Sequence, residues 1–209
     1  LPSISLISHF EANDARKTST IMSDGDFYPE LLKNKGGFTY KKILSATGAN
    51  FRKYIVGSAA ERNDVFFMRT SQNTNILRYA DVLLMHAEAI LAGGASTSNG
   101  SALNAFNEVR KRAGLPTKTV LTRDDLFKER RIEFALEGQY FFDLKRRGLS
   151  EALAIVSQQE VGFYSDAART NLISRKVTPG ANYFDLPLPQ SAIDTNPSLL
   201  EAPVPYNFN

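Results

Sequence analysis

Three glutamates, Glu129, Glu133 and Glu137, recur at every fourth position within one charged segment, Asp124 to Gly148. Residues four apart lie on one ridge of an α-helix. The same segment interleaves arginines and lysines with phenylalanines and a tyrosine. This combination is compatible with three kinds of chemistry: a catalytic carboxylate pair, a basic groove for nucleic acid, or a buried ion network that holds helices together.

A catalytic pair would consist of Glu129 and Glu133. Glycosidases use two carboxylates roughly 5–10 Å apart, and positions four apart on a helix are separated by about 6 Å. The neighbouring Lys128, Arg130 and Arg131 oppose this interpretation, because they lower the pKa of a carboxyl group whereas a general acid needs a raised one. We therefore expect no catalytic residue and no enzyme, and a glycoside hydrolase is the less favoured alternative.

A groove for nucleic acid would use the basic side chains of the same segment. These are Lys128, Arg130, Arg131, Lys145, Arg146 and Arg147. Phosphate binding needs positive charge that is not already compensated, and the interleaved carboxylates neutralise most of it. The whole chain carries 25 basic and 22 acidic residues, a net charge of only +3. We expect no nucleic-acid partner.

A buried ion network explains the segment best from physical chemistry. Arginine guanidinium groups bridge carboxylates in well-defined geometries, and such pairs cost desolvation but can fix the register of neighbouring helices. Arg110 is a natural further partner. The residues expected in the network are Arg78, Asp81, Glu88, Glu129, Arg130, Arg131, Glu133, Glu137 and Asp143.

Metal and cofactor sites are not indicated by any motif. The chain has no cysteine and only two histidines, His9 and His86, which do not form an HExxH pattern. The stretch SDGDFYPE, 23–30, alternates oxygen-bearing side chains but lacks the full calcium-loop pattern, so a surface turn is expected there. We expect no metal and no cofactor.

Composition places the chain among soluble globular proteins. It has 209 residues, 43% hydrophobic and 22% charged, which suits one ordinary domain or a large part of something bigger. No apolar run reaches the roughly 18 residues of a membrane span. The first residues, LPSISLISHFE, do not resemble a signal peptide, so we expect the sequence to begin inside a longer or processed protein.

The elements that would position these side chains are mainly helical. Residues 1–75 are broken by Gly, Asn, Asp and Ser and are expected to be loop-rich, with one β-like run, VFFMRT, at 65–70. Residues 76–160 are expected to form a helical core. Its first helix is predicted from Ile76 to the glycines at 93–94, with Thr74 or Asn75 as N-cap.

A second helix is predicted over residues 101–113, and with the first it resembles a tetratricopeptide-like hairpin. A third is predicted from the N-cap Thr122, with Asp125 completing a capping box, to Gly138. Shorter helices follow in FFDLKRRG and LSEALAIVSQQ. Residues 161–209 are expected to form an irregular, Pro-rich, extended tail that wraps over the body. The predicted fold class is mainly α, of the α-α superhelix type.

Four motifs in order resemble those of one known family. They are RYADVLLMHAEAI (78–90), AFNEVRKRAGLP (105–116), ERRIEFALEGQYFFDLKRRG (129–148) and LPLPQSAIDTNPSL (186–199), and NDARKTSTI (13–21) resembles a further upstream segment. Together they resemble the C-terminal half of the SusD/RagB-like outer-membrane glycan-binding lipoproteins.

The resemblance implies a fold, a location and partners. Members have tetratricopeptide-like hairpins packed against a loop-rich ligand-binding portion, and they are not enzymes. They sit on the outer-membrane surface through a lipidated N-terminal Cys, which would lie in a part absent from this chain. They deliver oligosaccharides, or in some members peptides, to a TonB-dependent, SusC-like transporter. A tetratricopeptide-type scaffold that binds peptide or protein is the alternative from another class.

Glycan sites of that family stack sugars on aromatic rings, often tryptophan, and this chain has no Trp. An aromatic face against the C–H side of a sugar is sound chemistry for weak glycan capture. The candidates in the loops are Phe27, Tyr28, Phe38, Tyr40 and Tyr164. The competing interpretation is that these rings form small cores beneath the loops. The sequence does not name the glycan, the missing portion or the oligomeric state.

Overall fold

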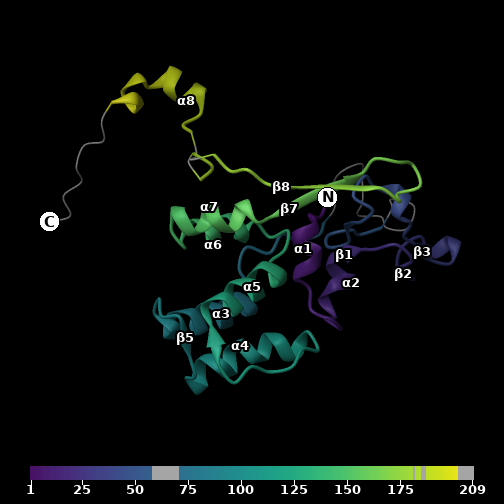
Figure 1. Ribbon diagram of the computed structural model, residues 1–209, viewed down its shortest axis with the longest axis horizontal. Coiled ribbons are helices and arrows are strands. Elements are labelled where there is room, and N and C mark those ends of the chain that lie inside the picture. Colours follow the sequence, from purple (N-terminus) through teal and green to yellow (C-terminus); the bar gives the residue numbers. More distant parts are fainter. Residues whose placement is uncertain (58–70, 181, 185–186, 202–209) are drawn as a thin grey trace. The chain divides into compact units, whose positions relative to one another are not determined.

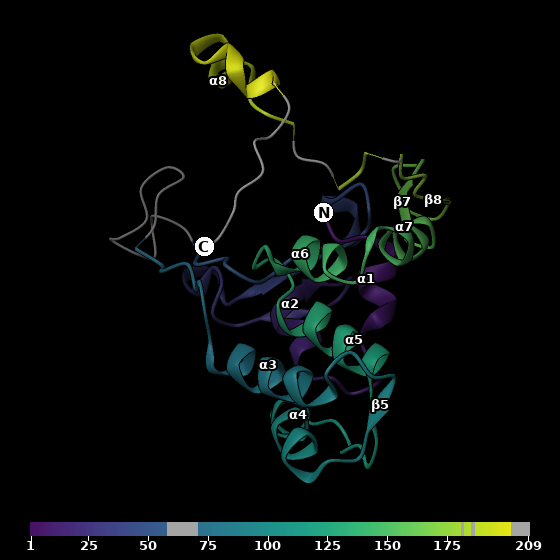
Figure 2. The same ribbon diagram turned by 90° about the vertical axis from the view of Figure 1, so that its left-hand side faces the viewer.

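The computed structural model of the chain describes residues 1–57, 71–180, 182–184 and 187–201. The chain divides into two compact units, residues 1–178 and residues 179–209. The first unit contains all the helices named below except α8 and η3, and its short strands form two-stranded ladders (Figures 1 and 2). The prediction of a mainly helical fold is confirmed. The strand predicted at 65–70 lies outside the described residues.

Helices α3 (Tyr79–Leu91) and α4 (Gly100–Arg112) form the predicted hairpin and lie side by side (Figures 1 and 2). Helix α3 ends at Ala92, which adopts a left-handed φ of 48°, a common way for a helix to terminate. Asn99 caps α4 by accepting hydrogen bonds from two backbone N–H groups of its first turn. The connection is therefore set by local residues.

The core of this hairpin consists of apolar side chains with no exposed surface. Leu84 and Ala87 of α3 pack with Phe106 of α4 and Leu126 of α5. Burying one large apolar side chain stabilises a fold by about 1.5–3 kcal/mol. On the opposite side of α3 several side chains are exposed, and Tyr79 is 67% exposed.

The predicted start of this first helix is wrong by about three residues. Arg78, not Thr74 or Asn75, is the N-cap, with extended φ and ψ of −128° and 160°. Ile76 and Leu77 are exposed before the helix begins. The physical reason is that the Arg78 side chain is held by Glu133 and Glu137, as described below, and the chain turns into α3 only after it.

Helix α5 (Arg123–Glu133) begins as predicted and ends earlier than predicted. Thr122 caps it, and Asp125 completes the capping box. The helix ends at Glu133 instead of continuing to Gly138, because Leu136 takes a left-handed φ of 69°. Just before α5, the strand β6 (Leu121–Thr122) pairs with β5 (Ser96–Thr97) from the α3–α4 connection.

The N-terminal portion has the short elements and many turns that the sequence predicts. Its side chains form two small cores. Phe10 and Ile21 pack with Ile132 of α5, and Met22 packs with Leu31 and two tyrosines. The elements are α1 (Ile4–His9), α2 (Arg16–Thr20), β1 (Ile21–Met22), β2 (Phe27–Tyr28), η1 (Lys33–Lys35), β3 (Phe38–Thr39), η2 (Lys42–Leu44) and β4 (Asn50–Phe51), with β1 paired to β4 and β2 to β3.

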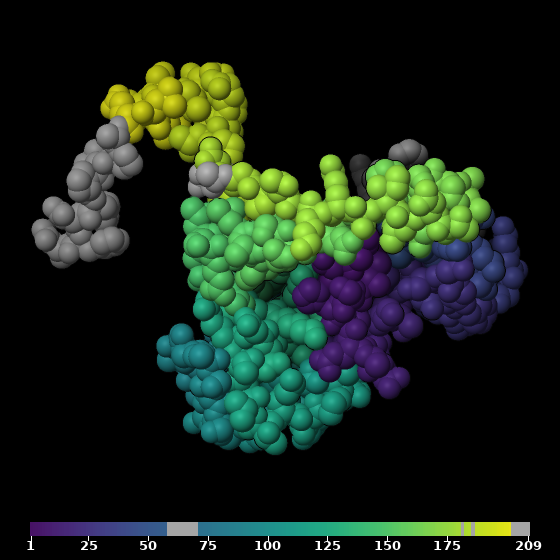
Figure 3. Space-filling model, in the orientation of Figure 1, coloured from purple at the N-terminus to yellow at the C-terminus, as the bar shows by residue number. Residues whose placement is uncertain are grey.

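After α5 the chain forms two short helices and a hairpin. Helices α6 (Gln139–Lys145) and α7 (Leu149–Ser157) lead into an antiparallel ribbon, β7 (Glu160–Tyr164) with β8 (Leu172–Lys176). This ribbon stands where the sequence predicts an irregular chain. Its turn is held by Asp166, whose carboxylate accepts hydrogen bonds from the backbone of Thr170 and Asn171. In the space-filling view, the N-terminal residues pack directly against the green and teal helices (Figure 3).

The second unit contains α8 (Gln190–Thr195) and η3 (Pro197–Leu200). The wrapping of this tail over the body stays a prediction. Among the described residues, no helix combines the length and the apolar character that crossing a membrane requires.

Candidate functional site

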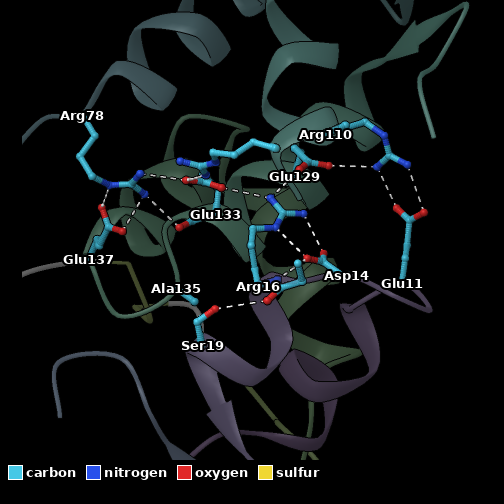
Figure 4. Close-up of polar contacts among 12 residues, drawn as sticks. Glu11, Asp14, Arg16, Ser19, Arg78, Arg110, Glu129, Glu133, Ala135 and Glu137 are labelled. Carbon is cyan, nitrogen blue, oxygen red and sulfur yellow. Dashed lines mark hydrogen bonds and ion pairs between the residues drawn. The ribbon is translucent and has the colours of Figure 1, made fainter. Parts of the chain in front are cut away.

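The three glutamates converge on cations that come from distant parts of the chain (Figure 4). Arg16 of α2 bridges the first two: its Nη1 lies 2.6 Å from Glu129 Oε1 and 3.1 Å from Glu133 Oε2. Its Nη2 donates at 2.7 Å to Asp14 Oδ2. The side chains of Glu129 and Glu133 are 3% and 2% exposed. One arginine therefore joins α2 to the buried ridge of α5.

Arg78 performs the same role at the other end of the ridge. Its Nη1 lies 2.8 Å from Glu133 Oε1, and its Nη2 and Nε donate to the two oxygens of Glu137 at 2.7 and 2.8 Å. Lys53 Nζ and Arg112 Nη2 also pair with Glu137 and Glu133, respectively. The fork of Arg78 holds the start of α3 against the end of α5.

Arg110 of α4 connects α5 to the first loop of the chain. Its Nη1 lies 3.1 Å from Glu129 Oε2, and its Nη1 and Nη2 reach the two oxygens of Glu11 at 2.9 and 3.1 Å (Figure 4). Bidentate arginine–carboxylate pairs are among the strongest polar contacts in proteins. The hydrogen bond from Arg110 and its charge hold the pKa of Glu11 below its usual value, against the opposing effect of burial.

A second ion cluster lies on the face of α5 that points to α3 and α6. Arg130 donates to Asp81 Oδ1 at 2.8 Å and to Asp143 Oδ1 at 3.0 Å, and all three side chains are buried. Arg146 extends the cluster, with Nη2 2.7 Å from Asp143 and Nη1 paired with Glu88. This cluster joins three helices through one guanidinium group.

Eight of the nine residues expected in the network form ion pairs, either with one another or with residues that were not expected. The ninth, Arg131, forms no ion pair with a described residue. Arg131 lies beside His9, with its Nη1 3.1 Å from Nε2 of the imidazole ring, and above the ring of Tyr140 at 4.5 Å from the centroid. Within the described residues, no carboxylate lies within 4.0 Å of Arg131. The reason is its direction on α5, since position 131 points away from the ridge that carries 129, 133 and 137.

Sequence reasoning missed five cations and acids that join the network from the N-terminal portion and from the end of α4. These are Glu11, Asp14, Arg16, Lys53 and Arg112. The segment NDARKTSTI was singled out only by resemblance. No periodicity could have paired Arg16 with Glu129, because 113 residues separate them.

The electrostatics of Glu133 are unsuited to acid–base work. Burial by itself raises the pKa of this carboxyl group, but hydrogen bonds from Arg112 and Arg78 outweigh it and lower the pKa to about 2. A group that stays ionised at neutral pH is not a proton donor. Glu129 and Glu133 also share one guanidinium group, which occupies the space where a glycosidic bond would have to lie.

The five candidate aromatic residues separate into buried and accessible rings. Tyr28 and Tyr40 are only 6% and 2% exposed and form a core with Met22 and Leu31. The Tyr28 hydroxyl donates to the Ile21 carbonyl at 3.3 Å. Neither ring has a face open to a sugar, so the structure contradicts these two as stacking residues: both are core beneath the loops.

Three candidate rings keep accessible surface. Phe27 is 56% exposed and lies over Gly37, where a Cβ would meet the ring at 2.5 Å. Phe38 is partly buried against the same small core. Tyr164 of β7 lies against Gly48, where a Cβ would meet its ring at 2.6 Å, and its backbone N–H donates to Ala46 at 2.7 Å. Because Gly37 and Gly48 have no Cβ, the backbone can approach the rings of Phe27 and Tyr164 closely.

The segment SDGDFYPE forms a turn closed by its own carboxylates. Asp26 Oδ2 accepts from the Ser23 N–H at 2.7 Å, and Asp24 Oδ1 accepts from the Lys42 N–H at 2.7 Å. Over the part of the chain that the structure describes, no three His, Cys, Asp or Glu side chains gather as a metal site would require.

Comparison with known proteins decides the family. The family model described as "SusD family" matches residues 5–204. The chain belongs to the SusD family. A SusD-like protein of Bacteroides ovatus is 32% identical over 238 residues, which cover 99% of this chain and 43% of that protein. This SusD-family chain therefore spans less than half the length of that curated relative.

Solved structures agree with this assignment. A protein crystallised with xylogluco-oligosaccharide superimposes with a TM-score of 0.80 at 30% identity, over 99% of this chain and 46% of that one. Surface glycan-binding protein A from Bacteroides thetaiotaomicron in complex with laminarihexaose gives a TM-score of 0.59 at 26% identity, over 92% of this chain and 38% of that one. Both are similar to this SusD-family chain across nearly its whole length.

Proposed function

We propose that this chain is the C-terminal part of a cell-surface protein that captures oligosaccharides without chemical change and hands them to a TonB-dependent, SusC-like transporter. The observation that carries the proposal is the similarity, over nearly the whole chain, to proteins solved with bound oligosaccharides. Those similarities reach only part of each neighbour, so each neighbour has surface that has no counterpart in this chain.

The geometry supports a binding role for the loops and a supporting role for the ions. Cations of the loop-rich portion are paired with carboxylates on and just after α5: Arg16 with Glu129 on the helix, and Lys53 with Glu137 beyond its end. The same portion carries Phe27 and Phe38, and Tyr164 packs on its residue Gly48. Aromatic rings held in this way lose little conformational entropy when a sugar stacks on them, which favours binding.

Titration calorimetry against neutral oligosaccharides tests the capture step. We expect xylogluco-oligosaccharide or laminarihexaose to bind, and Phe27→Ala and Tyr164→Ala each to weaken binding. Stacking contacts are worth roughly 0.5–1.5 kcal/mol beyond burial, which corresponds to a loss of about 2- to 13-fold in affinity. Phe142→Ala is the matched control, because Phe142 is 62% exposed on α6, outside the loops. Absence of binding across a broad glycan panel would remove the proposal.

A glycoside hydrolase predicts a different result from the same reagents. Release of reducing ends that Glu129→Gln abolishes would replace the binding proposal by an enzymatic one. A peptide-binding scaffold predicts heat of binding with peptides and none with sugars. The buried, arginine-bridged Glu129 and Glu133 favour neither alternative.

The location and the transporter are tested in cells. We propose that a lipid anchor upstream of this chain holds the protein on the outer-membrane surface. Surface proteolysis of intact cells should cleave the protein, and affinity purification should recover a TonB-dependent transporter with it. Complete protection from the protease together with recovery of no transporter would contradict this part of the proposal.

A further inference from the structure

A cavity separate from the aromatic loops lies among α1, α5, α6 and α7. Its volume is about 270 Å³, and its lining includes His9, Phe127, Lys128, Arg131, Tyr140 and Arg147. In the space-filling view the surface is hollowed where purple, teal and green atoms meet (Figure 3). Phe127 and the ring of Tyr140 give the cavity apolar walls, while its charged groups come from α5, from α6 and from the α6–α7 connection.

The most unusual group in this lining is Arg131. It is only 9% exposed, like the other buried arginines Arg110 and Arg130. Those two are each paired with carboxylates, whereas no carboxylate of the described chain is within 4.0 Å of Arg131. Burial lowers the pKa of Arg131, with a small opposing effect from Tyr140. A buried cation without a counter-charge is costly unless something compensates it.

The two groups that contact Arg131, the imidazole ring of His9 and the ring of Tyr140, are neutral. Nδ1 of His9 contacts the Ser5 carbonyl, and because a carbonyl only accepts, Nδ1 carries the ring proton. Nε2 of His9 is then the acceptor for Arg131 Nη1 at 3.1 Å. Burial and the charge of Arg131 hold the pKa of His9 below its usual value. The face of the Tyr140 ring also attracts the guanidinium group, but neither neighbour carries a negative charge, so Arg131 has no ionic counter-charge.

The other charges of the cavity do not cancel this one. Asp143 is bonded to Arg130 at 3.0 Å and Arg146 at 2.7 Å. Asp124 pairs with Arg147 at 2.6 Å. Lys128 lies one turn before Arg131 on the same side of α5 and is exposed. Among the described residues, Lys128 has no ion pair. Two cations, one in the wall and one at the rim, therefore face the same space.

We propose that this cavity binds the carboxylate of a small ligand with the size of one sugar ring, such as a hexuronate. Arg131 donates a fork of hydrogen bonds to the carboxylate, as guanidinium groups do. Lys128 adds charge at the entrance, and Phe127 and Tyr140 cover the apolar side of the ligand. The volume, slightly below the roughly 300–1,000 Å³ of pockets for drug-sized ligands, suits one ring. The site uses none of the residues of the aromatic loops, so its failure would leave the proposed capture of neutral glycans unaffected.

The two histidines provide a direct test. His9 lines the cavity, whereas His86 is exposed on α3 with its Nε2 2.9 Å from Ser101 Oγ. Sodium glucuronate, sodium acetate and glucose are titrated at constant ionic strength and pH 7.5 while the Cε1 proton resonances of both histidines are followed by NMR. We expect glucuronate to move His9 saturably and leave His86 unchanged, acetate to move His9 at higher concentration, and glucose to move neither.

Matched variants assign the effect to the two cations. Lys128→Gln is exposed and should leave the fold intact while weakening glucuronate binding by about 3- to 10-fold. Arg131→Lys keeps the charge but loses the planar fork, and should weaken it by about tenfold. Lys145→Gln is the control, because Lys145 is exposed on α6 outside the cavity lining. It should leave the affinity for glucuronate unchanged.

Either of two results would overturn the site. One is an unsaturated, parallel movement of both histidines, which would show a general salt effect. The other is an unchanged affinity for glucuronate in both Lys128→Gln and Arg131→Lys. If acetate binds as tightly as glucuronate, the cavity is a site for small carboxylates in general. If glucuronate binds more tightly than acetate, the ligand is an acidic sugar.

Discussion

Glu133→Gln is the sharpest perturbation of the ion network, because this carboxylate receives three arginines. Arg78 and Arg16 lie 2.8 and 3.1 Å from its oxygens, Arg112 pairs with it as well, and its side chain is 2% exposed. Glutamine keeps the size and removes the charge. It also turns an amide N–H₂ group toward guanidinium donors and leaves buried positive charge without compensation.

The magnitude follows from the pKa. The pKa of Glu133 falls from an ordinary 4.5 to about 2, and each pH unit corresponds to about 1.36 kcal/mol, so ionised Glu133 contributes about 3 kcal/mol. Because the pKa in the folded state is the lower one, this stability is present above pH 4.5 and is lost as the pH falls toward 2. Breaking a buried ion pair by removing one partner costs about 3–5 kcal/mol, which agrees with the contribution derived from the pKa of Glu133.

Urea denaturation at pH 7 and at pH 3.5 measures both consequences. We expect Glu133→Gln to lower the free energy of unfolding by about 3 kcal/mol at pH 7, and the gap to the unmodified protein to narrow by about 1 kcal/mol at pH 3.5. Glu108→Gln is the control, since Glu108 is exposed on α4. A loss below about 1 kcal/mol at pH 7, with a gap that does not change with pH, would refute the reasoning.

Three further predictions concern separate parts of the molecule. Arg130→Met should destabilise the fold by about 3–5 kcal/mol in urea denaturation, because Asp81 and Asp143 stay buried without their shared cation; a nearly neutral effect would contradict it. Thr122→Ala should cost about 1 kcal/mol through loss of the N-cap, and a matched Thr117→Ala on the exposed surface should cost much less. His9 should titrate by NMR with a midpoint below 6.5, because burial and Arg131 disfavour its charged form against the opposing Ser5 carbonyl. Stability should accordingly fall as the pH drops below about 6.5, and a midpoint at or above 6.5 would contradict this.

The parts of the fold that follow from local chemistry were predictable. The capping box at Thr122, the hairpin of α3 and α4, and the mainly helical class all depend on residues within a few positions of one another. The shared side of Glu129 and Glu133 was also predictable, because their spacing matches the helical period, whereas Glu137 lies beyond the end of α5. What these glutamates would contact was only partly visible, since Arg16 and Lys53 approach them from 113 and 84 residues away.

The errors have equally local causes. The predicted first helix began too early because Ile76 and Leu77 continue its apolar pattern, although both are exposed. The β7–β8 ribbon was not predicted because its strand sequences, EVGFY and LISRK, do not alternate apolar and polar side chains. Tyr28 and Tyr40 occupy turn-rich sequence, which favours surface positions, yet their rings form the core beneath the turns.

The ion pairs between the N-terminal portion and the region of α5 add a constraint that the apolar contacts of Phe10 and Ile21 with Ile132 do not supply. Apolar surfaces tolerate small shifts in register, because contact area changes little when one surface slides. The bidentate contact of Arg110 with Glu11 and the forked contact of Arg78 with Glu137 are satisfied in one arrangement only. Each buried acid of this set would be left unpaired by a displacement of about one residue, at a cost of about 1–3 kcal/mol or more. The network therefore fixes the orientation of loops that have little regular structure of their own, which is what the proposed glycan-binding surface would require of its scaffold.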